Sequence, residues 1–216
     1  MTEELKRLCR LQFISHFTER TGYIDGIHMA LDGGCRWIQL RMKSASEREF
    51  DEAALKVRKL CDSYNAVLVL DDRVYSVMPT GADGVHLGLH DMPVAEARKI
   101  LGRDKIIGGT ANTAEDIIMH YASGADYAGC GPFRYTSTKE RLSPVLGTEG
   151  YRNIIGRIRE LGIKIPVIAI GGITAEDIPH IIEAGADGIA VSGAVLHNED
   201  PAGAMRNLST IMNNII

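Results

Sequence analysis

Short apolar runs recur along the whole chain, and within each run the apolar positions are nearly continuous instead of alternating with polar ones. Such runs are typical of parallel strands that are buried on both faces. Eight are present: LQFIS (11–15), RWIQLR (36–41), AVLVLDD (66–72), GVHLG (84–88), KIIGGT (105–110), YAGCG (127–131), PVIAIGG (166–172) and GIAVSG (188–193).

Helical patterns separate most of these runs. The segment from Ser46 to Tyr64 opens with a serine suited to an N-cap, followed by acidic residues in its first turn. Two further segments open with TAED, at Thr113 and at Thr174, which resembles a capping box. A Gly-Ala-Asp phrase recurs at Gly81, Gly124 and Gly185, where the glycine can end a helix just before the next apolar run.

Eight strand–helix repeats in 216 residues predict a minimal (β/α)8 TIM barrel. We expect a single catalytic domain spanning residues 1–216, because no linker or low-complexity segment interrupts the repeats. A doubly wound parallel sheet is the alternative.

Composition narrows the possible partners. The formal net charge is -4 and there is no basic tail, so nucleic acid is not the expected main partner. No apolar run approaches the roughly 20 residues that span a bilayer, and the N-terminus lacks the apolar core of a secretory signal. Four widely spaced cysteines form no CxxC pair, which favours packing over a disulfide or zinc site. We expect a cytoplasmic protein, with a homo-oligomer possible.

In a TIM barrel the active site lies where the strands end and the βα loops begin. Many of the residues that follow the predicted strands could bind a ligand or take part in catalysis. Cations, carboxylates, hydroxyls and glycine backbone gather there: Gln39, Arg41 and Lys43; Asp71, Asp72 and Arg73; His90 and Asp91; Thr110 and Asn112; Thr136, Ser137, Thr138 and Lys139; Gly171 and Gly172; Val191, Ser192 and Gly193.

Each of these groups also has a structural interpretation. Arg41 and Lys43 could be solvated strand ends, and Asp71 and Asp72 could cap the next helix. His86 and His90 have the i, i+4 spacing of zinc-binding helices, but Gly88 and a strand intervene, so a hydrogen-bonded core histidine is the better interpretation of His86. These purely structural interpretations are less convincing together, because all of them would have to hold at once on one face of the barrel.

Taken together, the residues indicate two phosphate sites. Asp72 and Asp91 at neighbouring strand ends suit Mg²⁺, which proteins hold with one or two carboxylates plus substrate oxygens and waters. The nearby arginine and lysines suit a diphosphate. The glycines after the last two strands suit a monophosphate bound by backbone N–H groups. The chemistry therefore predicts a transferase that joins a diphosphate to a monophosphate.

Seven motifs resemble, in order and spacing, those of the thiamine phosphate synthase family. They are QLRMK, LDDRV, GVHLGLHDMP, IIGGTANT, GPFRYTSTK, VIAIGGI and IAVSGA, between Gln39 and Ala194. The resemblance implies condensation of 4-amino-2-methyl-5-hydroxymethylpyrimidine diphosphate with 4-methyl-5-hydroxyethylthiazole phosphate, which gives thiamine phosphate and pyrophosphate.

The resemblance also implies roles by position. Gln39, Arg41, Lys43, Asp71, Thr110 and Lys139 would bind the pyrimidine diphosphate, with Arg41, Lys43 and Lys139 as the catalytic cations. Asp72 and Asp91 would be the Mg²⁺ ligands. Thr136, Ser137, Thr138, Gly171, Val191 and Ser192 would bind the thiazole phosphate.

Four positions depart from the family pattern. Asp71 stands where the family usually has asparagine, which adds a negative charge opposite a diphosphate. We expect this carboxyl group to lie near the metal, to lie near Arg41, or to be partly protonated. Leu89 replaces a frequent glutamine, Thr110 a frequent serine, and Asn112 a frequent histidine.

The expected mechanism is a dissociative substitution in which the cations take up the charge that develops on the leaving pyrophosphate. A thiazole tautomerase of the same barrel family is one alternative, although Asn112 offers no proton chemistry. A non-catalytic barrel that senses thiazole or thiamine phosphate is another. A Schiff-base aldolase would need a lysine buried in a strand, whereas Lys43 and Lys139 lie beyond strand ends.

Overall fold

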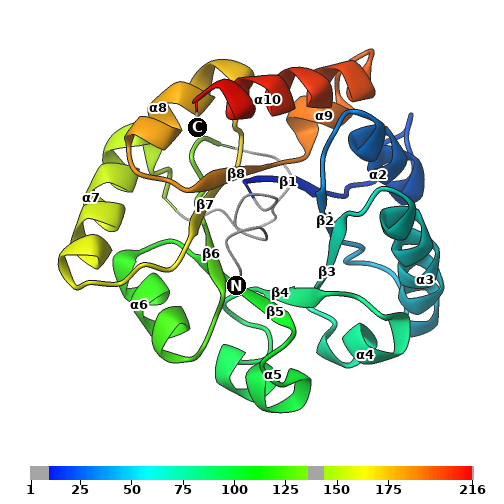
Figure 1. Ribbon diagram of the computed structural model, residues 1–216, viewed down its shortest axis with the longest axis horizontal. Helices are drawn as coiled ribbons and strands as arrows, with labels where there is room; N and C mark the ends of the chain where they lie inside the picture. The colour runs from blue at the N-terminus through cyan, green and yellow to red at the C-terminus, as the bar shows by residue number, and fades with distance from the viewer. Residues whose placement is uncertain (1–9, 136–143, 216) are drawn as a thin grey trace.

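All eight apolar runs form strands in the computed structural model, which describes residues 10–135 and 144–215. The strands close into a barrel in which every neighbouring pair is parallel and the last strand pairs with the first (Figure 1). Their bounds are β1 Leu11–Ile14, β2 Trp37–Leu40, β3 Val67–Asp71, β4 Gly84–Leu87, β5 Ile106–Ala111, β6 Tyr127–Cys130, β7 Val167–Ile170 and β8 Gly188–Val191. The predicted TIM barrel is confirmed, and the doubly wound alternative is wrong.

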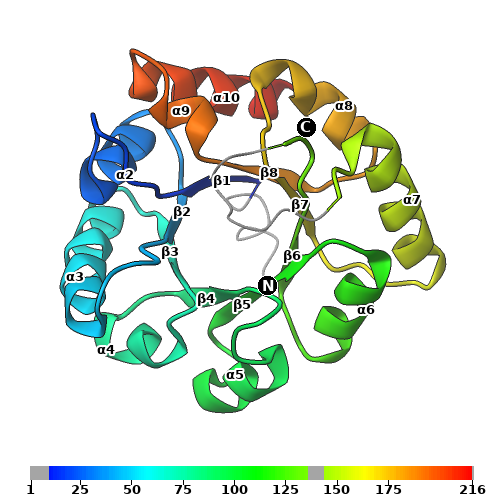
Figure 2. The ribbon, with the colours of Figure 1, turned by 180° about the vertical axis from the view of Figure 1, so that it is seen from behind.

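Helices surround the barrel in an outer ring (Figures 1 and 2). The described α-helices are α2 Tyr23–Asp32, α3 Glu47–Ser63, α4 Val77–Thr80, α5 Val94–Leu101, α6 Ala114–Ala122, α7 Gly147–Glu160, α8 Ile178–Glu183, α9 Gly193–Leu196 and α10 Pro201–Ile215, with short 3-10 turns η1 Val74–Ser76 and η2 Ala175–Asp177. Capping boxes are present at Ser46 and Thr113, as the sequence predicts. The box at Thr174 opens η2, which leads directly into α8.

The recurring Gly-Ala-Asp phrase has two functions in the fold. Its glycine ends a helix, as at Gly81, which follows α4 with a left-handed φ of +72°. Its aspartate, which the sequence pattern alone did not explain, accepts a backbone N–H from the start of a neighbouring strand and also pairs with an arginine. These Asp clasps join Asp83 to Leu68 and Arg58, Asp126 to Ile107 and Arg98, and Asp187 to Val167 and Arg159.

Alternation along each strand separates two apolar cores. A small cluster inside the barrel contains Trp37, Val69, Tyr127 and Ile168. The larger cluster lies between the strands and the helices, where residues such as Ile38 and Leu70 are fully buried. On β2 and β3 the same alternation places the side chains of Gln39 and Asp71 on the inner side, next to the barrel mouth.

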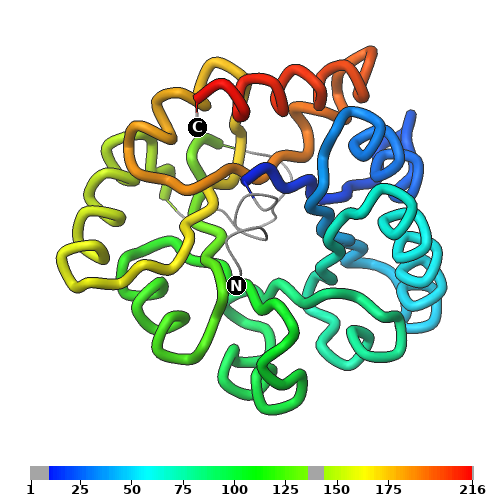
Figure 3. The backbone as a smooth tube through the Cα atoms, in the orientation of Figure 1, coloured from blue at the N-terminus to red at the C-terminus, as the bar shows by residue number. Residues whose placement is uncertain are grey.

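The tube drawing shows the blue N-terminal segment and the red C-terminal helix on the same side of the ring (Figure 3). Helix α10 packs beside α2, so the last helix covers the same side of the barrel as the first described one. Among the described residues, no helix combines the length and the apolar character needed to cross a membrane.

Candidate active site

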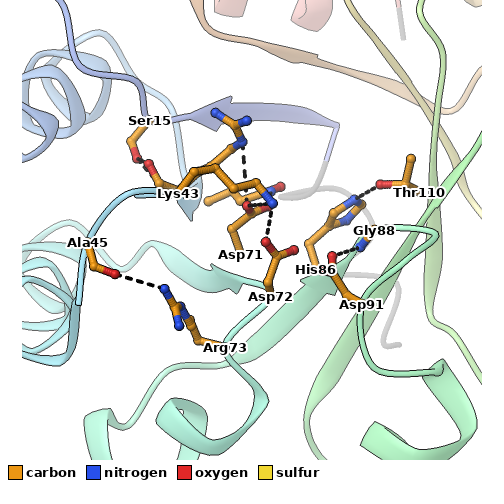
Figure 4. Close-up of polar contacts among 12 residues, drawn as sticks. Ser15, Lys43, Ala45, Asp71, Asp72, Arg73, His86, Gly88, Asp91 and Thr110 are labelled. Carbon is orange, nitrogen blue, oxygen red and sulfur yellow. Dashed lines mark hydrogen bonds and ion pairs between the residues drawn. The ribbon is translucent and has the colours of Figure 1, made fainter. Parts of the chain in front are cut away.

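The ends of β2 and β3 bring cations and carboxylates together at the mouth of the barrel (Figure 4). Asp71 is the last residue of β3 and only 7% exposed. Its carboxylate accepts a hydrogen bond from Gln39 Nε2 at 2.6 Å, and it lies 3.6 Å from Arg41 Nε and 3.3 Å from Lys43 Nζ. The expectation that this carboxyl group lies near Arg41 is confirmed, while its proximity to the metal and its partial protonation stay predictions.

Asp72 follows with a left-handed φ of +63°, a conformation that aspartate tolerates better than most residues. Its backbone N–H donates to the His86 carbonyl of β4 at 2.9 Å, which holds the turn. Its carboxylate accepts a hydrogen bond from Lys43 Nζ. Burial alone would lower the pKa of Lys43, but Asp71 and Asp72 outweigh burial and raise it, so the ammonium keeps its charge.

Asp91 approaches the cluster from the loop after β4. Its Oδ2 atom accepts the Gly88 N–H at 2.7 Å (Figure 4). Burial, and then the neighbouring Asp72 carboxyl group, raise the pKa of Asp91. Two carboxylates that disfavour each other's charge are a setting that a divalent cation stabilises.

The donor set at this point fits Mg²⁺. Asp72 and Asp91 supply two carboxylates, and no cluster of three or more His, Cys, Asp or Glu side chains that could hold a metal occurs in residues 10–135 and 144–215. Magnesium commonly takes one or two protein carboxylates and completes its shell with water and substrate phosphate. A fully protein-lined cage would suit other metals better.

Two residues that the sequence analysis did not assign also shape the site. Ser15, just after β1, accepts the Arg41 backbone N–H at 2.8 Å and donates to the Arg41 carbonyl at 3.2 Å. Arg73 donates to the Ala45 carbonyl at 3.1 Å and lies over the Phe50 ring. These hydrogen bonds fix the backbone at Arg41 and at Ala45, on either side of Lys43.

A pocket of about 460 Å³ opens at this cluster. Its lining consists of Met42, Lys43, Asp71, Asp72, Arg73 and Asp91. The pocket therefore contains both predicted metal ligands, one predicted catalytic cation and Asp71.

Thr110 lies on β5 with its side chain toward the barrel interior, where it begins a chain of hydrogen bonds. Its hydroxyl is 3.0 Å from His86 Nε2, and His86 Nδ1 is 3.0 Å from the Tyr127 hydroxyl. His86 is thus the hydrogen-bonded core histidine that the sequence predicts, while His90 is exposed in the loop after β4. Asn112, beyond the strand, donates its side-chain amide to the Gly131 carbonyl.

The other predicted phosphate site lies at the ends of β7 and β8, which are neighbours in the barrel. Gly171 and Gly172 follow β7 with φ values of +93° and +67°, which L side chains rarely adopt. Val191 ends β8, and the hydroxyl of Ser192 is buried without a hydrogen-bond partner among the described residues. A buried, unpaired hydroxyl next to a glycine turn suits an anionic ligand oxygen.

Thr136, Ser137, Thr138 and Lys139 lie outside the described residues, so their predicted roles stay predictions. The chain just before them is tied to the glycine turn. Arg134 N donates to the Gly171 carbonyl at 3.0 Å, and its guanidinium binds Asp177 in bidentate fashion at 2.8 and 2.9 Å. The loop after β6 therefore starts beside the turn after β7.

Comparison with known proteins gives one consistent family. The family model described as thiamine monophosphate synthase matches residues 11–195. A thiamine-phosphate synthase of Phocaeicola vulgatus is 56% identical over 93% of this chain and 97% of that protein. A protein of the same name from Bacteroides fragilis is 55% identical over 93% of this chain and 98% of its own length.

Solved structures agree with the sequence comparison. A thiamine phosphate pyrophosphorylase from Pyrococcus furiosus superposes with a TM-score of 0.86 at 34% identity, and the match covers 98% of this chain and 99% of that one. A 3-hexulose-6-phosphate synthase matches with a TM-score of 0.69 at 17% identity, over 94% of this chain and 99% of that one. This second likeness shows the fold alone.

Proposed function

The chain belongs to the thiamine monophosphate synthase family and is a transferase of thiamine biosynthesis, and we propose the specific reaction that it catalyses. The proposed substrates are 4-amino-2-methyl-5-hydroxymethylpyrimidine diphosphate and 4-methyl-5-hydroxyethylthiazole phosphate. The products are thiamine phosphate and pyrophosphate. The observation that carries this proposal is the cluster of Lys43, Asp71, Asp72 and Asp91 around one pocket, with Arg41 paired to Asp71 beside it.

The proposed mechanism is a dissociative substitution. The bond between the pyrimidine methylene carbon and the diphosphate oxygen breaks, and its electron pair leaves with pyrophosphate. The electron-rich aminopyrimidine stabilises the resulting cation, and the lone pair of the thiazole nitrogen forms the new C–N bond. No general base is required, because a neutral ring nitrogen is already a nucleophile.

The residues of this chain bind and orient the reactants. Arg41 and Lys43, with Lys139 as a predicted third cation, would hold the leaving diphosphate, and such preorganised groups typically lower a barrier by roughly 3–4 kcal/mol each. Gln39 Oε1 is a buried acceptor with no partner among the described residues, which suits an amino group of the pyrimidine. Thr110, oriented by His86, would supply a second polar contact to that ring.

Asp72 and Asp91 would hold Mg²⁺. When bound, this ion would neutralise negative charge on the diphosphate leaving group. The buried hydroxyl of Ser192 and the glycine turn at Gly171 would bind the thiazole phosphate, which places the ring nitrogen for attack.

The test is pyrophosphate release by the purified protein. We expect release only when both substrates and Mg²⁺ are present, and none in EDTA. Magnesium-independent binding of the thiazole phosphate without any pyrophosphate release would instead support a thiazole tautomerase or a non-catalytic thiazole or thiamine phosphate sensor, and would contradict the proposal.

Two predictions from the sequence stay predictions. They are a location in the cytoplasm and the possible formation of a homo-oligomer.

The three cysteines among the described residues, Cys35, Cys61 and Cys130, are buried free thiols. Burial raises the pKa of Cys35 to about 11 and the pKa of Cys130 to about 12, so these two thiols pack in the core as unreactive groups.

A further inference from the structure

Asp71 pairs with the two cations that the proposed diphosphate needs. Its Oδ2 atom lies 3.3 Å from Lys43 Nζ and 3.6 Å from Arg41 Nε, while its Oδ1 atom accepts the Gln39 side-chain N–H. All three partners come from β2 or the loop after it, and the carboxylate itself is nearly buried. The Asp71 carboxylate is therefore already paired with Arg41 and Lys43, the two cations that an incoming anion would have to bind.

The charge balance of the pocket makes this pairing costly for an anion. Among the described residues that line the pocket, three are carboxylates, Asp71, Asp72 and Asp91, and two are cations, Lys43 and Arg73. Arg41 adds a third cation beside this lining, where it pairs with Asp71. Arg73 is already engaged by the Ala45 carbonyl and the Phe50 ring. A diphosphate that enters this pocket meets three carboxylates and must compete with Asp71 for Arg41 and Lys43.

We propose that Asp71 is a specificity-determining residue that masks Arg41 and Lys43 in the metal-free protein, so that a diphosphate binds well only together with a divalent cation. The proposal rests on the proposed function, because it concerns the same diphosphate site. Substrates that lack a metal-chelating diphosphate are disfavoured by the same charge. Asp71 thereby selects the metal–diphosphate pair over a simple monophosphate.

Substitution of Asp71 by asparagine isolates the charge. Asparagine has the same shape, and its Oδ1 atom can still accept the Gln39 N–H, so the side chains of the cluster stay supported. Substitution by serine removes both the charge and the contact with Gln39. The two variants together separate masking of the cations from their positioning.

The measurement is the binding of inorganic pyrophosphate to metal-free protein by calorimetry in EDTA. For Asp71→Asn we expect a dissociation constant about tenfold lower than for the wild type, since a unit charge within about 4 Å of a partner at a protein surface has an effect of this order or more. Asp71→Ser should also bind pyrophosphate more tightly than the wild type. Addition of Mg²⁺ should tighten binding less in both variants than in the wild type.

Asp187→Asn is the matched control. It makes the same change in net charge and also removes a carboxylate from an arginine, 2.8 Å from Arg159, but just before β8, at the opposite end of the barrel from the site. It should bind pyrophosphate as the wild type does. Magnesium also binds pyrophosphate in solution, and because that equilibrium is the same for every variant, the comparison between variants removes it.

Two outcomes overturn the inference. If Asp71→Asn binds metal-free pyrophosphate no more tightly than the wild type, Asp71 does not mask the cations. If Asp187→Asn tightens binding equally, the effect is one of net charge and not of Asp71. Thermal unfolding of each variant confirms that folded protein is compared.

The test is independent of the proposed reaction, because it uses neither organic substrate and requires no turnover. If Asp71→Asn binds pyrophosphate more tightly but the wild-type protein makes no thiamine phosphate, the masking role is upheld and the proposed function is refuted. Unchanged binding in a protein that makes thiamine phosphate would do the reverse.

Discussion

The two carboxylates Asp72 and Asp91 are held by different contacts: Lys43 donates to the Asp72 carboxylate, and the Gly88 backbone N–H donates to Asp91. Asp91 uses one oxygen for the Gly88 N–H, and Asp72 is directed into the pocket by its left-handed turn. This arrangement positions two charged groups in a partly buried site, at a cost that is visible in the raised pKa of Asp91. Such costs are common where a site binds a charged ligand.

The first residue-scale prediction concerns Asp91→Asn. The amide can still accept the Gly88 N–H, so the fold should be retained while one carboxylate charge is lost. We expect kcat at saturating Mg²⁺ to fall about 100-fold or more, which is typical when a group that stabilises transition-state charge is removed. Steady-state pyrophosphate release measures this effect.

The control for this variant is Asp62→Asn, whose carboxylate is 65% exposed on α3 and pairs with Arg58. It should leave kcat unchanged. Near-normal turnover of Asp91→Asn would show that Asp91 is not a metal ligand.

The second prediction concerns Ser192→Ala. Because the Ser192 hydroxyl is buried without a partner among the described residues, its removal should leave the free energy of unfolding unchanged or slightly higher. The KM for the thiazole phosphate should rise about tenfold, the usual effect of losing one hydrogen bond to a charged ligand. A loss of stability with an unchanged KM would mean that the hydroxyl is structural.

The three Asp clasps explain how the short strands hold their register. Asp126 accepts the Ile107 N–H at 2.8 Å and the Arg98 guanidinium at 2.6 Å, and so joins the start of β5 to the turn before β6. The side chains of this pair are 18% and 24% exposed. Partial burial makes the hydrogen bonds stronger than those of a surface ion pair.

The third prediction is that Asp126→Asn lowers the free energy of unfolding by about 1–3 kcal/mol, because it leaves a partly buried arginine with a weaker partner. Chemical denaturation measures this loss. The kcat should stay unchanged, because the clasp lies at the end of the barrel opposite the site. A fall in kcat with no loss of stability would contradict the assigned structural role.

The fourth prediction concerns the Asp177–Arg134 pair, which joins the loops after β6 and β7. Burial alone would raise the pKa of Asp177, but the Thr174 backbone N–H and the Arg134 guanidinium outweigh burial and lower it below 3.8. A lowered folded pKa contributes stability that is present above the ordinary value and is lost as the pH falls through the folded value.

The corresponding measurement compares the wild type with Asp177→Asn. Since the Arg134 side chain is 50% exposed, we expect a difference in unfolding free energy of only about 1 kcal/mol at neutral pH. The difference should shrink as the pH falls below 3.8. A difference that grows in acid would show that the carboxylate is not the stabilising species.

The elements were largely predictable from the sequence, because their signals are local. Continuous apolar runs gave the eight strands to within about two residues of their bounds, and the serine and threonine N-caps gave the starts of α3 and α6. The Asp clasps were not predictable, because each joins residues from different repeats. The sequence listed Arg73 at the strand end but assigned it no role, because its partners, Ala45 and Phe50, belong to the preceding loop and helix.

Closure of the barrel brings functional side chains from distant parts of the chain to one end of the barrel. Residues that follow β1, β2, β3 and β4 meet in the cluster of Figure 4, and β8 pairs with β1, which carries the Ser15 side of that cluster. The predicted monophosphate site at β7 and β8 is therefore only one strand away from β2. Two phosphorylated substrates can share such a mouth.

The predicted barrel fold alone predicted where the site lies, because the strand ends of a TIM barrel share one face. It could not predict which ion pairs the charged side chains form. That Asp71 would take both Arg41 and Lys43 depends on side-chain distances across two strands. For this reason the sequence left open whether this carboxyl group lies near the metal, lies near Arg41 or is partly protonated.

In the proposed reaction, this protein forms a C–N bond between the two substrates as pyrophosphate leaves. The most direct measurement follows both substrates and both products together by ¹H and ³¹P NMR, with Mg²⁺ and in EDTA. We predict that thiamine phosphate and pyrophosphate appear in equal amounts, that both substrates disappear at the same rate, and that EDTA stops the reaction. Pyrophosphate without thiamine phosphate, or consumption of the thiazole phosphate alone, would contradict this account.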